Sequence, residues 1–189
     1  APGLNATLSG PYGRLVLPGE GRRLFLVATS AGLAPYLPML HSLEQSTSVP
    51  FESVHLLFGV RSPEECLCRP WLDDLALSHA WFDWEVFYSQ SLPSKPAMNE
   101  HQGYVTSGLQ DPARFDPAQD WVLLCGNPMM VDEGFALMKE RGFKSKRVIR
   151  EKYLFARQER KASDLKMSDA DRALLQAKMA RYQATPDSK

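Results

Sequence analysis

The sequence predicts an α/β domain in which a five-stranded parallel sheet carries helices on both faces. Apolar runs and helical stretches alternate along most of the chain, with one strand–helix unit roughly every 30 residues. The runs are continuously apolar, which is typical of parallel strands that are buried on both sides. Because the crossover between two parallel strands is right-handed, successive helices are expected to cover both faces of such a sheet.

Each apolar run marks one expected strand. The expected strands cover residues 24–28, 54–58, 84–88, 121–125 and 148–155. Helical spacing of apolar residues follows at residues 35–44, 70–79 and 129–141. Proline and polar residues mark residues 91–102 and 110–119 as loops.

The chain divides into three expected parts. Residues 1–20 contain turn residues and a short strand-like piece at 14–18, and we interpret them as the trailing part of another domain and a linker. The α/β domain is expected to cover residues 21–157. Residues 158–189 lack strong apolar runs and are expected to form a helical or partly disordered tail.

The charge and hydropathy exclude several classes of protein. The 22 basic and 22 acidic residues balance, which argues against a primary role in nucleic-acid binding. No apolar run approaches the ~20 residues of a membrane span, and no leader pattern begins the chain, so we expect a cytoplasmic protein. The basic stretch 139–161 fits a solvated surface or a docking patch for an acidic partner.

The three cysteines indicate neither a disulfide framework nor a metal site. Their number is odd, and Cys66 and Cys68 are separated by one residue. Tetrahedral zinc needs four ligands, and no second Cys or His pair accompanies these two. We expect Cys66, Cys68 and Cys125 to be reduced thiols, and we expect no metal.

Two strand-to-helix turns carry the residues that suggest chemistry. The first runs from Thr29 to Tyr36 and contains small residues, which allow a backbone to approach a phosphate closely. With only one glycine, Gly32, it fits a tight structural turn equally well. The second includes Cys125 and Gly126; Cys125 fits either a small buried hydrophobe or a side chain facing a ligand cleft.

Taken together, segments in register resemble the ferredoxin–NADP reductase family. Residues 24–43 resemble its strand, Thr-Gly-x-Gly-[Ile/Met/Leu]-Ala-Pro-[Phe/Tyr] turn and helix, and residues 55–75 resemble its next strand with Gly-Val-Arg and an acidic pair. Residues 103–106 match Gly-x-[Val/Ile]-Thr, and residues 125–130 match Cys-Gly-x-Pro-x-Met. Residues 151–155 resemble the bacterial ending in which an aromatic side chain covers the flavin, and residues 10–13 resemble the last hairpin of the flavin domain.

The resemblance implies an NAD(P)H-dependent flavin reductase that is represented mainly by its nucleotide domain. Hydride would pass between the nicotinamide and an FAD held by an upstream domain that this chain lacks. The reduced flavin would then pass electrons to a ferredoxin, a flavodoxin, an iron–sulfur domain or an oxygenase component. The catalytic residues it implies are Cys125 near the nicotinamide, Tyr153 stacked on the isoalloxazine, and Glu151. The cofactor-binding residues it implies are Thr29, Ser30, Gly32, Ala34, Pro35, Arg61, Ser89, Gln90, Tyr104, Gly126, Asn127 and Met130.

Departures from the family pattern bear on the cofactor. Ser30 replaces the first glycine of the turn, which reduces backbone freedom there. Gln90 and Tyr104 stand where NADP-dependent bacterial members carry arginines, while Arg61 remains and Lys95 is a substitute cation within reach. The resemblance therefore favours NADH over NADPH. A non-catalytic nucleotide-binding module and an α/β domain without a dinucleotide site are the alternatives.

Overall fold

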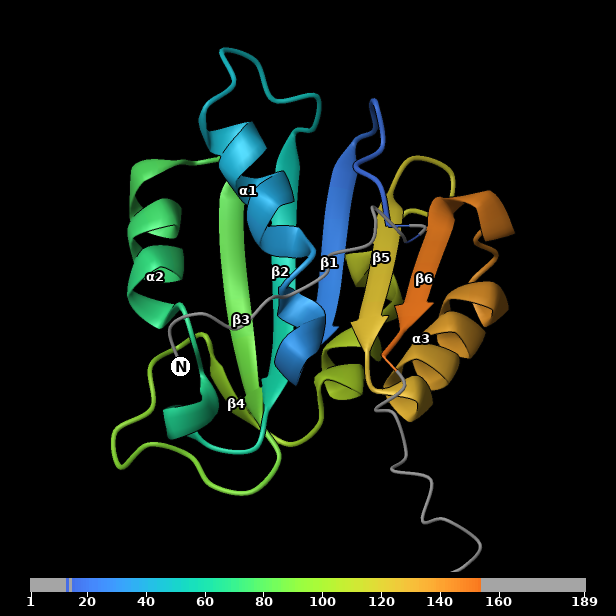
Figure 1. Ribbon diagram of the computed structural model, residues 1–189. Helices are drawn as coiled ribbons and strands as arrows, with labels where there is room; N and C mark the ends of the chain where they lie inside the picture. Colours follow the sequence, from blue (N-terminus) through green and yellow to red (C-terminus); the bar gives the residue numbers. More distant parts are fainter. Residues whose placement is uncertain (1–12, 14, 154–189) are drawn as a thin grey trace, which may run out of the picture. The chain divides into compact units, whose positions relative to one another are not determined.

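The computed structural model describes residue 13 and residues 15–153, which form a parallel sheet with helices on both faces (Figure 1). The strands are β1 (Arg23–Thr29), β2 (Ser53–Val60), β3 (Phe82–Tyr88), β4 (Glu100–Gln102), β5 (Trp121–Gly126) and β6 (Val148–Lys152). The α-helices are α1 (Tyr36–Glu44), α2 (Arg69–Ser78) and α3 (Pro128–Glu140). Short 3-10 helices lie between them: η1 (Ser30–Leu33), η2 (Pro63–Glu65), η3 (Val105–Leu109), η4 (Pro112–Arg114) and η5 (Ser145–Arg147).

The strand order is β4-β3-β2-β1-β5-β6, and each neighbouring pair is parallel. The order reverses direction at β1, since β2 extends the sheet to one side and β5 to the other. The expected pairing of residues 24–28 with 121–125 is confirmed, because Leu24 lies opposite Trp121 and Ala28 opposite Cys125. In doubly wound sheets, ligands bind beyond the carboxyl ends of the strands at this reversal.

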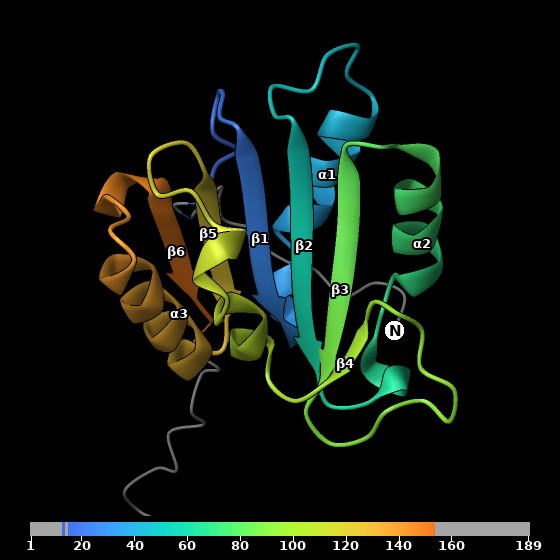
Figure 2. The ribbon, with the colours of Figure 1, turned by 180° about the vertical axis from the view of Figure 1, so that it is seen from behind.

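The sheet separates two apolar cores, as the apolar strand runs predict. Alternate residues of one strand point to opposite faces, so Leu24 and Leu26 of β1 pack with α1 and α2, while Phe25 and Val27 pack with η3 and α3. Figure 2 shows α3 on the side of the sheet opposite to α1. Leu24, Leu26 and Val27 are fully buried, and each such side chain stabilises the fold by about 1.5–3 kcal/mol.

All five expected strands are present, and a sixth lies in a segment expected to be a loop. β4 spans three residues and pairs with the end of β3, with Val86 opposite Glu100 and Tyr88 opposite Gln102. Its sequence is polar throughout, and it lies at the edge of the sheet. A strand this short carries no periodic signal.

Two other expectations need correction or lie beyond the described residues. No strand forms over residues 15–18, although Leu15 and Leu17 pack against the core from outside the sheet. The last strand ends at Lys152, three residues before its expected end, and Tyr153 is the last described residue. The expected helix within residues 158–189 and the hairpin at 10–12 lie outside the described residues.

Candidate functional site

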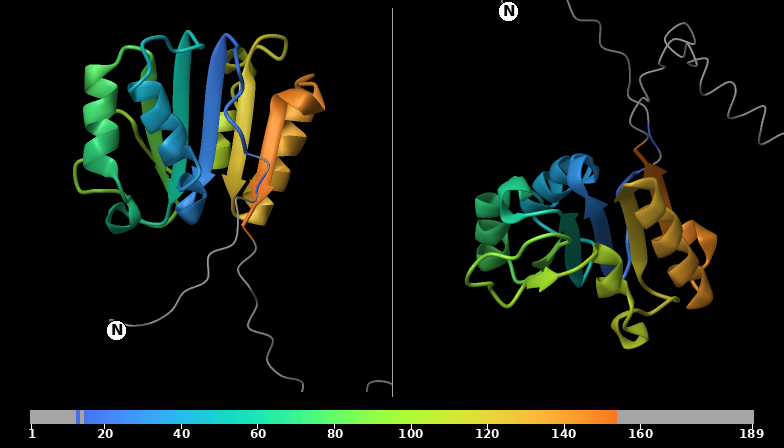
Figure 3. Two further views of the ribbon diagram at one scale, coloured as in Figure 1. Left: turned by 45° about the horizontal axis from the view of Figure 1, so that its top comes forward. Right: turned by 90° about the horizontal axis from the view of Figure 1, so that it is seen from below.

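The strands place most of the predicted site residues along one edge of the sheet, because these residues lie at the ends of strands or just beyond them. Figure 3 (right) views the sheet from this carboxyl edge. Thr29 ends β1, Arg61 follows β2, and Ser89 follows β3. Tyr104 lies two residues beyond β4, and Gly126 ends β5. Side chains separated by up to 124 residues in the sequence (Thr29 to Tyr153) therefore share one edge.

The central feature of the edge is the close packing of the ends of β1 and β5. Gly126 has φ +127°, and a Cβ there would lie under 3.0 Å from the side chain and the carbonyl oxygen of Thr29. Gly32 is buried against the backbone of Cys125, where a Cβ would again have no space. The Thr29 hydroxyl accepts a hydrogen bond of 2.8 Å from the Asn127 amide. Two glycines thus let two strand-to-helix turns touch at the carboxyl edge where the strand order reverses, the usual position for a ligand in such a sheet.

The β1 turn exposes its backbone at the edge. Ser30 is exposed and has φ +47°, in the left-handed region that glycine favours. This conformation explains why the family places glycine at this position, and shows that serine keeps the turn. Ala34 is exposed and Pro35 is partly buried, immediately before α1 begins at Tyr36.

The β5 turn is fixed by Asn127, which caps α3. Its side-chain oxygen accepts a hydrogen bond of 2.8 Å from the Met129 amide, while its own amide donates to Thr29. Met130 is buried against the η3 face, whereas Met129 is 80% exposed beside the cap. Met130 therefore supports the turn from below and does not reach the edge.

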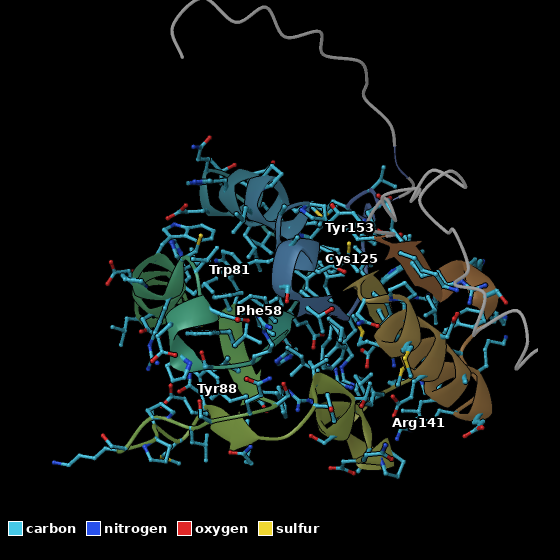
Figure 4. The ribbon with its side chains drawn as sticks, turned by 60° about the horizontal axis from the view of Figure 1, so that its bottom comes forward. Phe58, Trp81, Tyr88, Cys125, Arg141 and Tyr153 are labelled. Carbon is cyan, nitrogen blue, oxygen red and sulfur yellow. The ribbon has the colours of Figure 1, made fainter. Side chains whose placement is uncertain are left out.

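Cys125 lies beneath the edge and not on it. Its side chain is fully buried in the core shared with Tyr36, and Figure 4 shows it beside Tyr153. Burial, and to a lesser extent the nearby Glu151, raise the pKa of the Cys125 thiol to about 11, although a hydrogen bond with Tyr153 opposes this in part. At neutral pH Cys125 is a thiol covered by Tyr153. The interpretation that its side chain faces an open cleft therefore does not match the described residues.

Tyr153 and Glu151 lie at the end of β6, on the α1 side of the sheet. The Tyr153 amide donates to the Gly126 carbonyl at 2.9 Å, and its partly buried ring packs against the first core. Glu151 lies close to Gly13, where a Cβ would be 2.9 Å from its carboxylate. Tyr36 was not among the expected site residues. It is buried nearby, and its hydroxyl donates a hydrogen bond of 3.3 Å to the Val27 carbonyl.

The opposite half of the edge holds the residues expected near the adenosine. Arg61 is exposed, and its guanidinium lies 2.5 Å from the Glu65 carboxylate, which raises the pKa of Arg61. The Gln90 amide donates to the Arg61 carbonyl at 2.9 Å, so the two residues lie side by side just beyond the ends of β3 and β2. Tyr104 is 75% exposed and follows Gly103, whose amide donates to the Tyr88 carbonyl at 2.8 Å.

A buried charged group beside these residues was not anticipated from the sequence. The Glu100 carboxylate is buried and accepts hydrogen bonds from Arg69 (2.5 Å), Tyr88 (2.9 Å) and the Ala97 amide (2.7 Å). Its three donors come from α2, β3 and the loop before β4. A lone glutamate in a polar segment gives no sequence signal for such a role, because its two side-chain partners lie 12 and 31 residues away along the chain.

The described residues contain no group of three His, Cys, Asp or Glu side chains placed to hold a metal ion. Within the same part of the chain, no helix has the length and apolar character needed to cross a bilayer. All three cysteines are free, as expected.

Comparisons with known proteins agree with this geometry. The family described as "Oxidoreductase NAD-binding domain" matches residues 26–133. A 2-halobenzoate 1,2-dioxygenase electron transfer component of Burkholderia cepacia is 29% identical over 126 residues, which are 67% of this chain and 36% of the relative. A ferredoxin–NADP reductase of Pseudomonas aeruginosa is 29% identical over 150 residues, which are 71% of this chain and 56% of the relative.

Solved structures give the same result. The crystal structure of the Amycolatopsis cytochrome P450 reductase GcoB superimposes with a TM-score of 0.63 at 26% identity, over 76% of this chain and 42% of that chain. The chain therefore spans only about a third to just over half of the length of these relatives. The chain belongs to the oxidoreductase NAD-binding domain family, in the form found in ferredoxin–NADP reductases and related electron-transfer components.

Proposed function

We propose that this chain is the nucleotide-binding part of an NAD(P)H-dependent flavin reductase that supplies electrons to an oxygenase component or a ferredoxin. The observation that carries the proposal is the joined pair of turns at the ends of β1 and β5, where Gly32 and Gly126 remove the side chains that would keep the turns apart. This junction lies at the carboxyl edge where the strand order reverses, the usual binding position for a dinucleotide.

The residues at the edge fit a nicotinamide dinucleotide laid along it. We propose that Thr29, Ser30 and Gly32 hold the pyrophosphate, because the small residues of this turn allow a phosphate to approach its backbone. Gly126 and Asn127 border the nicotinamide end, and Arg61, Gln90 and Tyr104 border the adenosine end. A nicotinamide held at this edge would supply the hydride for a flavin, so the residues of this chain contribute position and electrostatics.

The residues of this chain act mainly by positioning. Cys125 sits behind the nicotinamide end as a neutral thiol, because burial keeps its pKa at about 11. Tyr153 covers Cys125 on the α1 side, where the ends of β5 and β6 face the expected flavin domain. We propose that Tyr153 stacks on the flavin ring and that Glu151, at the end of β6, lies near it.

The charges at the adenosine end favour NADH. The 2′-phosphate of NADPH needs cations, and Arg is favoured because its planar fork binds phosphate through two hydrogen bonds. Arg61 already pairs with Glu65, and Gln90 and Tyr104 are uncharged. A phosphate placed here would have to displace Glu65 from Arg61 or remain close to its carboxylate.

Isothermal titration of the 189-residue chain with NADH and NADPH tests the proposal. We expect NADH to bind with a Kd at or below about 1 mM, the upper end of typical enzyme KM values, and NADPH to bind more weakly. The same chain fused to a flavin domain of a related reductase should reduce FAD with NADH. Absence of nucleotide binding would refute the proposal, and binding without flavin reduction would favour the non-catalytic module.

A further inference from the structure

The carboxylate of Glu100 joins three segments at the adenosine end of the site. Its side chain is only 1% exposed, so its charge depends on the protein for compensation. Arg69 at the start of α2 and the Tyr88 hydroxyl at the end of β3 donate to one oxygen, and the Ala97 amide donates to the other. Burial alone would raise the pKa of Glu100, but these donors outweigh burial and lower it.

The segments that Glu100 joins are the ones that carry the expected adenosine contacts. Tyr88 is followed directly by Ser89 and Gln90, while Glu100 begins the strand that leads to Tyr104. Between β3 and β4 the chain is mostly exposed, with Lys95 at its surface. β4 pairs with β3 over only three residues, so backbone pairing alone holds this segment weakly.

The rest of the group ties the same segments to α2. Arg69 lies 3.5 Å from Asp73, and Asp73 accepts a hydrogen bond of 3.2 Å from the indole of Trp84 on β3. On the other side of β3, the side-chain amide of Asn99 donates to the Trp84 carbonyl at 3.3 Å. A connected polar group of this kind has a defined geometry because each member fixes the next.

We propose that Glu100, with Arg69 and Tyr88, is a positioning group that sets the adenosine subsite, an inference that rests on the proposed nucleotide-binding function. Glu100 touches no ligand in this arrangement. It acts by holding the ends of the segment 89–104, so that Gln90 and Tyr104 keep their places at the sheet edge.

The chain offers a matched control at the opposite edge of the same sheet. Asp120 is fully buried, accepts two hydrogen bonds from Arg23 (3.1 and 2.7 Å), and accepts a third from the Asp116 amide at 2.7 Å. It thus matches Glu100 in charge and burial and in its arginine and backbone-amide donors, and it lacks only the tyrosine hydroxyl. It precedes β5 at the amino edge, remote from the proposed site.

The test compares Glu100→Gln with Asp120→Asn in the 189-residue chain. Each substitution replaces one carboxylate oxygen with an NH2 group, and this group cannot accept the hydrogen bond that the oxygen accepted. Both variants should therefore lower the Tm by a few degrees. Titration calorimetry is carried out well below the Tm. ADP-ribose and 5′-AMP report on the adenosine half of the site, and nicotinamide mononucleotide reports on the nicotinamide half. We expect Glu100→Gln to weaken ADP-ribose and 5′-AMP binding about tenfold and to leave nicotinamide mononucleotide unchanged, and Asp120→Asn to change none of them.

Tyr88→Phe is the milder second variant, because it removes one donor and keeps the ring. It should weaken 5′-AMP binding by a smaller factor, and it is the decisive measurement if Glu100→Gln does not fold. Equal effects of the Glu100 and Asp120 substitutions, or an equal loss for both halves of the dinucleotide, would overturn the inference. A wild-type chain that binds neither NADH nor ADP-ribose would instead refute the proposed function.

Discussion

At the residue scale, burial and charge distinguish side chains that the sequence presents as equivalent. The three cysteines are an example: Cys68 is exposed, whereas Cys66 and Cys125 are buried and have pKa values raised by burial to about 11. Likewise, Arg61 and Arg69 both follow the second strand, yet Arg61 pairs with Glu65 at the surface and Arg69 pairs with a buried carboxylate.

We predict that a disulfide reagent will modify one thiol rapidly in the folded chain and two more only on unfolding. Cys68 is the thiol that should react rapidly, and Cys68→Ser should abolish the rapid reaction.

The stability of the chain should also fall at high pH. Because the folded pKa of Cys66 and Cys125 lies above the unfolded value of 9.0, their contribution to stability is complete below pH 9 and is lost as the pH rises towards 11. Rapid modification of two thiols in the native chain would contradict the burial of Cys66 or Cys125.

The cofactor preference is a second residue-scale prediction. Replacing Gln90 by Arg adds the cation that NADP-dependent members carry, which can form a charge-assisted bond of ~1.5–3 kcal/mol with the 2′-phosphate. In the chain joined to a flavin domain, this change should raise the ratio of kcat/KM for NADPH to kcat/KM for NADH at least tenfold. Gln45→Arg, beyond the end of α1, adds the same charge at the opposite edge and should leave the ratio unchanged. A wild type that prefers NADPH would overturn the NADH proposal, and Lys95 would then be the next residue to replace.

At the scale of elements, the two strand-to-helix turns act as one unit. η1 follows β1, α3 follows β5, and the buried glycines let the two turns share a hydrogen bond between Thr29 and Asn127. The position of the proposed pyrophosphate site is therefore a property of two non-adjacent segments, and neither turn creates it alone.

We predict that Gly126→Ala will destabilise the chain by about 3 kcal/mol and abolish NADH binding. The positive φ costs about 1–2 kcal/mol, and overpacking against Thr29 adds ~1–3 kcal/mol. Gly142→Ala is the control, because Gly142 also has a positive φ (+87°) but has open space around its Cβ. Chemical denaturation should give only the positive-φ cost of about 1–2 kcal/mol for the control; equal costs for the two variants would show that the turns are not closely packed.

At the scale of the whole molecule, this chain belongs to the NAD-binding domain family, and its proposed role is one half of a two-cofactor reaction. Its sheet edge fits a nucleotide, whereas the flavin-phosphate pattern Arg-x-Tyr-Ser of the family does not occur in the sequence. Part of the positive charge after α3 is used within the fold, since Arg147 donates to the Gln119 carbonyl at 3.1 Å and Lys152 pairs with Asp132 at 2.7 Å. A docking patch for an acidic partner would have to rest on the remaining cations of residues 139–161.

We accordingly predict that the purified 189-residue chain binds NADH but not FAD. Equilibrium dialysis against FAD should leave it without visible flavin absorbance, while titration with NADH gives a binding isotherm. A version joined to a flavin domain should be yellow, and it should lose its colour on anaerobic addition of NADH. Retention of FAD by the 189-residue chain would show that the flavin site does not need another domain.

The sequence by itself determined the fold class, the five main strands and the family. These depend on local signals: continuous apolar runs mark strands buried on both faces, and short motifs follow at their ends. The residues expected at the site, among them Thr29, Gln90 and Gly126, then fall along one edge because parallel strands all end on the same side of the sheet.

Only the tertiary structure decided the features that depend on distant partners. The strand at 100–102 exists because β3 offers it backbone partners, and the sequence of β4 alone contains no strand pattern. Glu100 is recognisable as a positioning group only once Arg69 and Tyr88 surround it, and Cys125 changes from a cleft residue to a buried thiol once Tyr153 covers it. Burial and hydrogen bonding are properties of the surroundings of a residue, and folding brings those surroundings together from separate parts of the chain.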